Sequence, residues 1–140
     1  TGPRRQGRSR LPQAHKKVIE EHAVEVAMKH LEKKGFTNIK DVGKNHSYDI
    51  AAKLNGLDFY IEVKGTISLG EKVVLTKNEV LLHRQEHPNN ALIVVSQIDL
   101  DRTEPPSAKG GRILFISPWK IEDSELEALG YDYTINSQHR

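Results

Sequence analysis

The spacing of apolar residues changes once within the first half of the chain, and the change predicts a change of element. Across residues 14–34 apolar side chains recur at the spacing of an amphipathic helix, and Gly35 follows where a helix C-terminal cap belongs. After Gly35 the period becomes two, which predicts three strands at 36–42, 48–54 and 57–64. The first half is therefore expected to form a long helix followed by a three-stranded meander.

The second half of the chain is predicted to add a helix and two buried strands. Residues 76–79 form a Thr-x-x-Glu capping box, and the helix that follows should end by His87 because Pro88 forbids its continuation. The apolar runs 91–95 and 112–117 predict strands that are buried on both faces. Less regular segments are expected to form a short strand at 72–75, a functional or mobile loop at 99–111, a helix at 123–129 and a last strand at 131–135.

Helices that alternate with strands predict an α/β domain with a mixed central sheet flanked by helices. We expect this domain to span residues 14–135, between a basic flexible arm or linker at 1–13 and a tail at 136–140. The chain begins at Thr1 rather than at Met, and its first residues have a composition that does not pack. We therefore expect it to be a fragment of a larger protein.

Composition excludes several classes of protein. The 140 residues include no cysteine, which excludes a disulfide-stapled secreted domain and a zinc ribbon. Apolar runs are far shorter than the roughly 18 residues of a membrane-spanning helix, and nothing resembles a signal peptide. An intracellular protein, in the cytoplasm or with the nucleoid or nucleus, is expected.

Charge is distributed unevenly along the chain. Residues 1–17 hold six basic and no acidic side chains, a charge of +6, so with a net charge of +2 the remainder carries −4. The basic arm could bind phosphates or serve as a solvated linker. Because the body is mildly acidic, a prediction of nucleic-acid binding has to rest on a specific site.

The turn at Asn55-Gly56 brings two carboxylates together. Both turn residues tolerate the positive φ angles of a two-residue hairpin, and the resulting register places Asp49 opposite Glu62. Residues two apart on a strand share a face, so Lys64 stands beside Glu62. The hairpin is therefore predicted to gather two acids and one lysine on one face.

This trio suggests a metal site, although a simpler interpretation remains open. Two carboxylates about 5 Å apart repel by roughly 3 kcal/mol at an effective dielectric constant near 20. Protonation of one acid, the ammonium of Lys64 or a divalent cation would relieve that repulsion. In the metal interpretation Asp49, Glu62 and the Val63 carbonyl bind Mg²⁺ or Mn²⁺, and Lys64 orients or deprotonates water. The alternative is a surface cluster of ion pairs.

Two motifs resemble a known nuclease superfamily. Ser-Tyr-Asp-Ile at 47–50 and Ile-Glu-Val-Lys-Gly at 61–65 resemble the D…(D/E)-x-K signature of the PD-(D/E)XK, or restriction-endonuclease-like, superfamily. The order of predicted elements is similar to that superfamily's αβββαβ core. The stretch 20–133 also resembles the domain of unknown function at the C-terminus of the plant protein NO VEIN and of helicase-linked bacterial proteins.

The resemblance implies a metal-dependent endonuclease. It makes Asp49 and Glu62 the metal ligands and Lys64 the catalytic lysine, and it implies a glutamate from the first helix, for which Glu21 and Glu25 are both candidates. DNA is the expected substrate by resemblance, while the residues themselves do not separate DNA from RNA. Dimerisation, or a helicase or ATPase domain in the same protein, is expected to assist cleavage.

Other candidates carry weaker signals. Phosphate contacts are expected from Lys44, Lys53, Lys77 and Asn78. His83 and His87 have a spacing that can bind zinc, but packing is the favoured role, and Trp119 is expected to anchor the core. The rival function is a catalytically silent module that binds nucleic acid or docks onto a protein.

Overall fold

The computed structural model describes residues 11–139. The predicted basic arm falls largely on residues 1–10, which lie outside the described residues. The elements, in chain order, are α1 (Gln13–Lys33), β1 (Thr37–Asp41), β2 (Ile50–Leu54), β3 (Leu57–Gly65), α2 (Lys77–Glu86), β4 (Asn90–Ser96), β5 (Asp99–Asp101), β6 (Ser107–Lys109), β7 (Arg112–Ile116) and two short 3-10 helices, η1 (Asp123–Glu125) and η2 (Ser137–His139).

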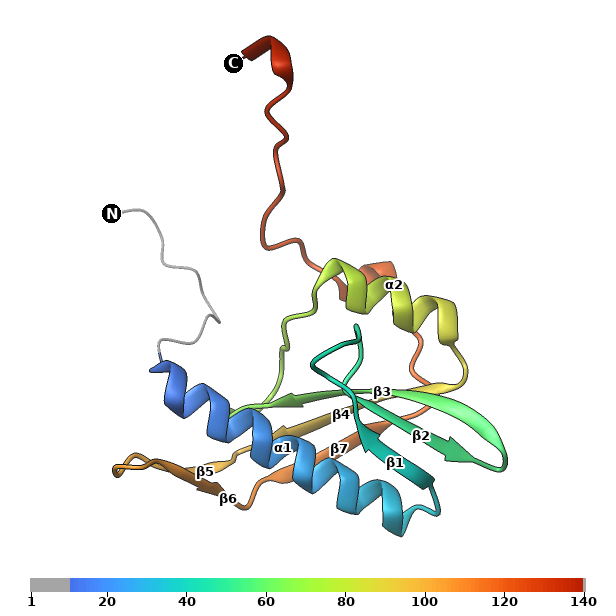
Figure 1. The fold of residues 1–140 in the computed structure, drawn as a ribbon, viewed down its shortest axis with the longest axis vertical. Coiled ribbons are helices and arrows are strands. Elements are labelled where there is room, and N and C mark those ends of the chain that lie inside the picture. Colours follow the sequence, from blue (N-terminus) through green and yellow to red (C-terminus); the bar gives the residue numbers. More distant parts are fainter. Residues whose placement is uncertain (1–10, 140) are drawn as a thin grey trace.

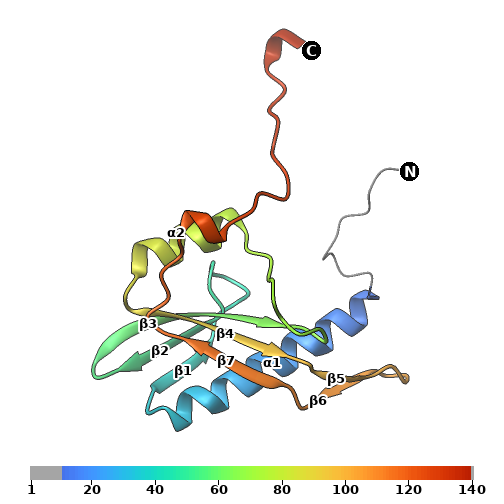
Figure 2. The ribbon, with the colours of Figure 1, turned by 180° about the vertical axis from the view of Figure 1, so that it is seen from behind.

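Five strands form one mixed sheet in the order β1-β2-β3-β4-β7. Strands β3 and β4 are parallel, and their other neighbours are antiparallel. Helix α1 lies against one side of the sheet and α2 against the other (Figures 1 and 2). The architecture is the α/β fold with a flanked mixed sheet that the sequence predicts, and the order α1, β1, β2, β3, α2, β4 agrees as well.

The β2–β3 hairpin has the predicted register. Leu54 pairs with Leu57 across the turn, and Ile50 pairs with Ile61 at the other end of β2. Asn55 and Gly56 have φ angles of 53° and 77°, the left-handed values that a type I′ turn requires. The identity of the two turn residues therefore fixes which residues face each other across the hairpin.

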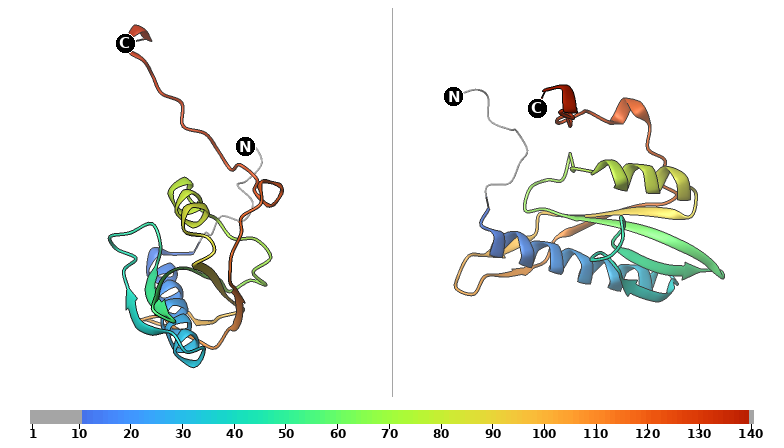
Figure 3. Two further views of the ribbon diagram at one scale, coloured as in Figure 1. Left: turned by 90° about the vertical axis from the view of Figure 1, so that its right-hand side faces the viewer. Right: turned by 45° about the horizontal axis from the view of Figure 1, so that its top comes forward.

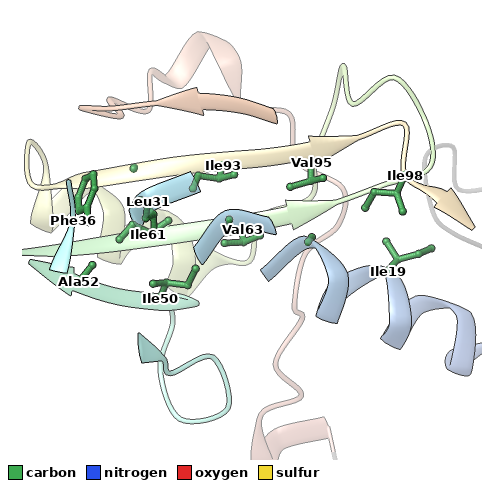
Figure 4. Close-up of a cluster of buried hydrophobic side chains, with 13 residues drawn as sticks. Ile19, Leu31, Phe36, Ile50, Ala52, Ile61, Val63, Ile93, Val95 and Ile98 are labelled. Carbon is green, nitrogen blue, oxygen red and sulfur yellow. The ribbon is translucent and has the colours of Figure 1, made fainter. Parts of the chain in front are cut away.

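Two hydrophobic clusters cover opposite faces of the sheet. The larger cluster packs α1 against the sheet and includes Ile61 and Val63 of β3 (Figure 4). The smaller cluster consists of Leu92, Val94, Trp119 and Ile121 together with side chains of α2 and the segment before it. Because side chains alternate along a strand, Glu62 and Lys64, the neighbours of Val63 in β3, lie on the α2 face.

The predicted strand at 72–75 is wrong. The structure has no strand there, because the parallel pairing of β3 with β4 leaves this connection outside the sheet. Val73 and Leu75 instead pack on the smaller cluster. Their alternation with polar neighbours therefore reflects side-chain packing rather than pairing of the backbone.

Three further expectations for the C-terminal half need correction. The predicted loop at 99–111 contains the β5–β6 hairpin, and His22 of α1 contacts the Gly110 carbonyl at 2.8 Å beside it. The predicted helix at 123–129 is only the short η1, and no strand forms at 131–135. That segment leads away from the sheet (Figure 3), and the Tyr131 side chain is 92% exposed. Without a core or a neighbouring strand to pair with, apolar alternation alone does not make a strand.

Within residues 11–139, no helix combines the length and the apolar character that crossing a membrane requires.

A close contact between α1 and the end of β3 generates a testable prediction. A Cβ at Gly65 would lie 2.6 Å from the Ala23 Cβ and 3.2 Å from the Ile19 carbonyl oxygen, so Gly65→Ala should push α1 away from the sheet. We expect a loss of about 1–3 kcal/mol in the free energy of unfolding, measured by urea denaturation. Gly130→Ala is the control, because a Cβ there meets nothing within 4 Å. Equal unfolding midpoints for the two variants would contradict this packing.

Candidate active site

A cavity of about 730 Å³ opens beside the C-terminal end of β3, between α1 and the start of α2. Its lining comes from α1, the connection between β1 and β2, the end of β3 and the first turn of α2. The charged residues of the lining are Lys17, Glu20, Glu21, Asp41, Lys44, Asp49, Lys64 and Glu79. Acidic side chains outnumber basic ones in this lining, which suits a positively charged ligand.

Asp49 enters the site immediately before β2 begins. Its backbone N–H donates to the Ile61 carbonyl at 3.0 Å, so the chain slips by one residue and Asp49 is not paired in the ladder opposite Glu62 as the register predicted. Its Oδ2 accepts the Val63 N–H at 2.8 Å. A Cβ at Gly43 would lie 3.1 Å from the Asp49 Oδ1, so glycine lets the β1–β2 connection close over this carboxylate.

Glu62 is buried beside Asp49. Its side chain is only 1% exposed, and burial is the main cause that raises its pKa to about 9, followed by the charge of Asp49 and a hydrogen bond between the two carboxyl groups. Glu62 is therefore a neutral acid at pH 7. The negative charge of Asp49 contributes to this raised pKa, and protonation of Glu62 relieves the repulsion between the two acids.

Lys64 connects β3 to the first turn of α2. Its Nζ lies 3.1 Å from the Glu79 Oε1 and 3.5 Å from the Glu62 Oε2. The same Glu79 oxygen accepts the Thr76 N–H at 2.9 Å, and the Glu79 N–H donates to the Thr76 hydroxyl, which completes the predicted capping box. The sequence predicts only the capping role of Glu79. Its second contact arises only when the fold brings Lys64 to the helix terminus.

His83 of α2 contacts Glu62, and neither residue is part of the cavity lining. Its Nε2 is 3.3 Å from the Glu62 Oε1, and burial lowers the pKa of its imidazole to about 4. Because both side chains are neutral at pH 7, this contact is a hydrogen bond rather than an ion pair. His83 also stacks at an angle on Trp119, which is buried in the smaller cluster as the sequence predicts.

Three oxygen atoms in this region are of the hard type that divalent cations prefer. Val63 directs its carbonyl to the same side of β3 as its N–H, which points at Asp49, because both groups of a strand residue project in one direction. Asp49, Glu62 and this carbonyl would thus offer the hard oxygen ligands that Mg²⁺ or Mn²⁺ prefers. A cation would replace the proton that Glu62 holds.

In the part of the chain that the structure describes, no cluster of three or more acidic or histidine side chains could hold a metal, so the zinc spacing of His83 and His87 has no third ligand.

The two candidate glutamates of α1 lie in different places. Glu21 lines the cavity, as does Glu20, which sequence analysis did not consider. Glu25 does not line the cavity, and its Oε1 lies 3.5 Å from the Lys29 Nζ. Residues three and four apart share a helix face, so Lys17, Glu20 and Glu21 lie together on α1. They line the cavity because this face of α1 lies beside the end of β3, a position that the helix sequence alone does not predict.

The predicted phosphate contacts are dispersed. Lys44 lines the cavity, whereas Lys53 does not and forms a 2.8 Å ion pair with Asp58 near the hairpin turn. Lys77 and Asn78 are exposed in the first turn of α2, next to Glu79. Of these four residues, Lys44 alone lines the cavity.

The neutral state of Glu62 predicts an unusual dependence of stability on pH. In the metal-free protein, the folded state keeps a proton on Glu62 up to about pH 9, whereas the unfolded state loses it near the ordinary pKa of 4.5. The free energy of unfolding should therefore fall as the pH rises from 6.5 to 9. The lowered pKa of His83 acts in the opposite direction, but only between about pH 4 and 6.5.

Glu62→Gln should flatten this decline, because an amide keeps hydrogen-bonding groups at the site and does not titrate. Urea denaturation in metal-free buffer at pH 6.5, 8 and 9 measures the effect. Glu25→Gln, at an exposed position outside the cavity, should decline like the wild type. A wild-type stability that is constant or rises over this range would contradict a neutral buried Glu62.

The sequence was also compared with known proteins. Residues 19–109 match the family described as Protein NO VEIN, C-terminal, and this match covers more than half of the chain and contains Asp49, Glu62 and Lys64. No curated protein and no solved structure matches the chain. The chain therefore belongs to the family of the C-terminal domain of protein NO VEIN.

Proposed function

We propose that this domain is a divalent-metal-dependent endonuclease that hydrolyses phosphodiester bonds of DNA. The observation that carries the proposal is the contact between Asp49 and a buried Glu62 beside a charged cavity, with the Lys64 ammonium 3.5 Å from the Glu62 carboxyl. Burying two acids together lowers the stability of a fold, whereas a cation site requires this arrangement. DNA rather than RNA is inferred from the resemblance of these residues to the PD-(D/E)XK signature.

Asp49, Glu62 and the Val63 carbonyl are the proposed ligands of Mg²⁺ or Mn²⁺. The bound cation would act as a Lewis acid that offsets the negative charge of the phosphate under attack. The Val63 N–H holds the Asp49 carboxylate at 2.8 Å and so fixes its orientation before any ligand arrives. Preorganised ligands of this kind reduce the cost of binding.

Lys64 is the proposed catalytic lysine. Its ammonium lies between the carboxyl groups of Glu62 and Glu79, and its side chain is 23% exposed, so it can reach a water molecule in the cavity. From this position it would orient the attacking water and stabilise charge on the phosphate. Hydrolysis then adds water across one P–O bond and leaves a phosphate monoester and a hydroxyl group.

The acidic lining suggests that the domain acts with other parts of a larger protein. Glu20, Glu21 and Asp41 would repel a bare phosphate backbone, and Lys17 and Lys44 offset them only in part. Further phosphate contacts would come from Lys77 and Asn78, from the basic arm, or from a helicase or ATPase domain or a second copy of the chain. Such a role belongs inside the cell, in the compartment that holds the DNA.

One observation favours a second candidate, a catalytically silent module that binds nucleic acid or a protein. The Glu62 side chain is 1% exposed and Lys64 is engaged by two carboxyl groups, so both are already satisfied without substrate. In this case the buried cluster would serve only to hold α2 on the sheet. Metal binding and cleavage separate the two functions.

Substitutions at the two principal residues should have different effects. Asp49→Asn is expected to abolish both Mn²⁺ binding, measured by calorimetry, and nicking of supercoiled plasmid, because it removes a ligand charge. Lys64→Met is expected to keep Mn²⁺ binding and to slow nicking by about 100-fold or more, the usual contribution of a group that acts on water.

Lys53→Met is the matched control, because Lys53 is paired with Asp58 and does not line the cavity. It should bind Mn²⁺ and nick plasmid as the wild type does. Mn²⁺ binding without nicking by the wild type would favour the silent module, and nicking that survives Asp49→Asn would contradict the proposed site.

The two glutamates of α1 offer a second test. Glu21→Gln should weaken Mn²⁺ binding by up to about fivefold, because it removes one partly solvated negative charge from the cavity. Glu25→Gln should leave the affinity unchanged, because that carboxylate lies beside Lys29 instead. Calorimetric titrations of both variants measure the difference. A larger effect of Glu25→Gln would mean that α1 presents a different face to the cavity.

A further inference from the structure

A chain of three buried polar side chains runs from the sheet to the candidate metal site. Asn90 of β4 and His83 of α2 are completely buried, and Glu62 is nearly so. The Asn90 Nδ2 lies 3.1 Å from the His83 Nδ1, and the His83 Nε2 lies 3.3 Å from the Glu62 Oε1. Removing three polar groups from water is costly, and apolar residues of similar size would fill this space at lower cost.

Backbone contacts fix the orientation of Asn90. The Trp119 N–H donates to the Asn90 Oδ1 at 3.1 Å, so this atom is the amide oxygen. The Nδ2 amino group has two hydrogens and faces three acceptors, the Trp119 carbonyl at 3.0 Å, the His83 Nδ1 at 3.1 Å and the His83 carbonyl at 3.3 Å, so the two contacts with His83 share one hydrogen. A flipped amide would turn its amino group toward the Trp119 N–H and its oxygen toward the two carbonyls, so none of these hydrogen bonds could form.

This orientation determines the tautomer of His83. The Asn90 amino group can only donate, so the His83 Nδ1 that faces it must accept. The single proton of the neutral ring is therefore on Nε2, which donates it to the Glu62 Oε1. The ring is also held by contact with the Trp119 indole, whose centroid is 4.6 Å away.

We propose that His83 is a positioning residue of the metal site, held by Asn90 in the tautomer that carries its proton on Nε2. Its N–H binds one oxygen of Glu62 from behind and leaves the other, Oε2, on the side of Lys64, 3.5 Å from its Nζ. Hydrogen bonds of this kind orient carboxylate ligands and hold their free oxygen toward a cation. This inference rests on the proposed function and adds to it the residues that aim the Glu62 ligand.

The first test measures the tautomer in the metal-free wild-type chain, and it is independent of any activity. Nitrogen NMR of the histidine-labelled protein at pH 7 should show the His83 Nε2 protonated and the Nδ1 bare. A ring protonated on Nδ1, or on both nitrogens, would overturn the proposal.

The second test measures Mn²⁺ affinity by calorimetry. His83→Leu removes the N–H and keeps an apolar side chain in the core, and it should weaken Mn²⁺ binding by about 10-fold to 100-fold. His83→Gln should recover most of the lost affinity, because the glutamine amide reaches about as far as Nε2 and donates in the same direction. A purely structural role would not distinguish these two variants by metal affinity.

Ile121→Ala is the matched control, because it removes buried side-chain atoms from the smaller cluster, and the apolar Ile121 side chain forms no hydrogen bond with Asn90, His83 or Glu62. It should lower the stability and leave the Mn²⁺ affinity unchanged. Wild-type affinity in His83→Leu would overturn the positioning role alone. A wild-type chain that binds no Mn²⁺ would contradict the proposed function, and the positioning role with it.

Discussion

The burial of the Glu62 carboxyl beside Asp49 is the constraint on which the other features of the site depend. A carboxyl group this far from water is neutral, and its pKa near 9 makes it available to exchange a proton for a cation. Three neighbours act on the same group: the charge of Asp49 raises its pKa, Lys64 lies near one oxygen and His83 binds the other. These contacts also join α2 to the sheet, so stability and the candidate chemistry use the same atoms.

The fold produces this arrangement through the alternation of β3. Ile61 and Val63 point into the core under α1, which places Glu62 and Lys64 on the face of α2. Asn90 is the first residue of β4 and pairs with Tyr60 of β3 in the parallel ladder. This position brings the Asn90 side chain within hydrogen-bonding distance of His83. A sheet with two different faces is therefore needed, one to bury α1 and one to bury polar groups.

Much of this structure follows from the sequence, and the exceptions have physical reasons. The turn at Asn55-Gly56 determined the hairpin register, and the capping box determined the start of α2, because both depend on neighbouring residues only. The contacts of Glu79 and Asn90 could not be predicted, since they join segments that are distant in the chain. The carboxyls of Asp49 and Glu62 were expected to meet through strand pairing. The two groups interact although the backbone slips at Asp49, a local shift that no apolar pattern records.

The proposed exchange of a proton for a cation at Glu62 can be measured directly. Calorimetric titration of Mn²⁺ into the metal-free chain at pH 7.5, in two buffers with different enthalpies of ionisation, counts the protons released on binding. We predict one Mn²⁺ site in the wild type, with about one proton released on binding. Mn²⁺ binding to Glu62→Gln should release no proton. Binding without proton release, or no binding at all, would contradict it.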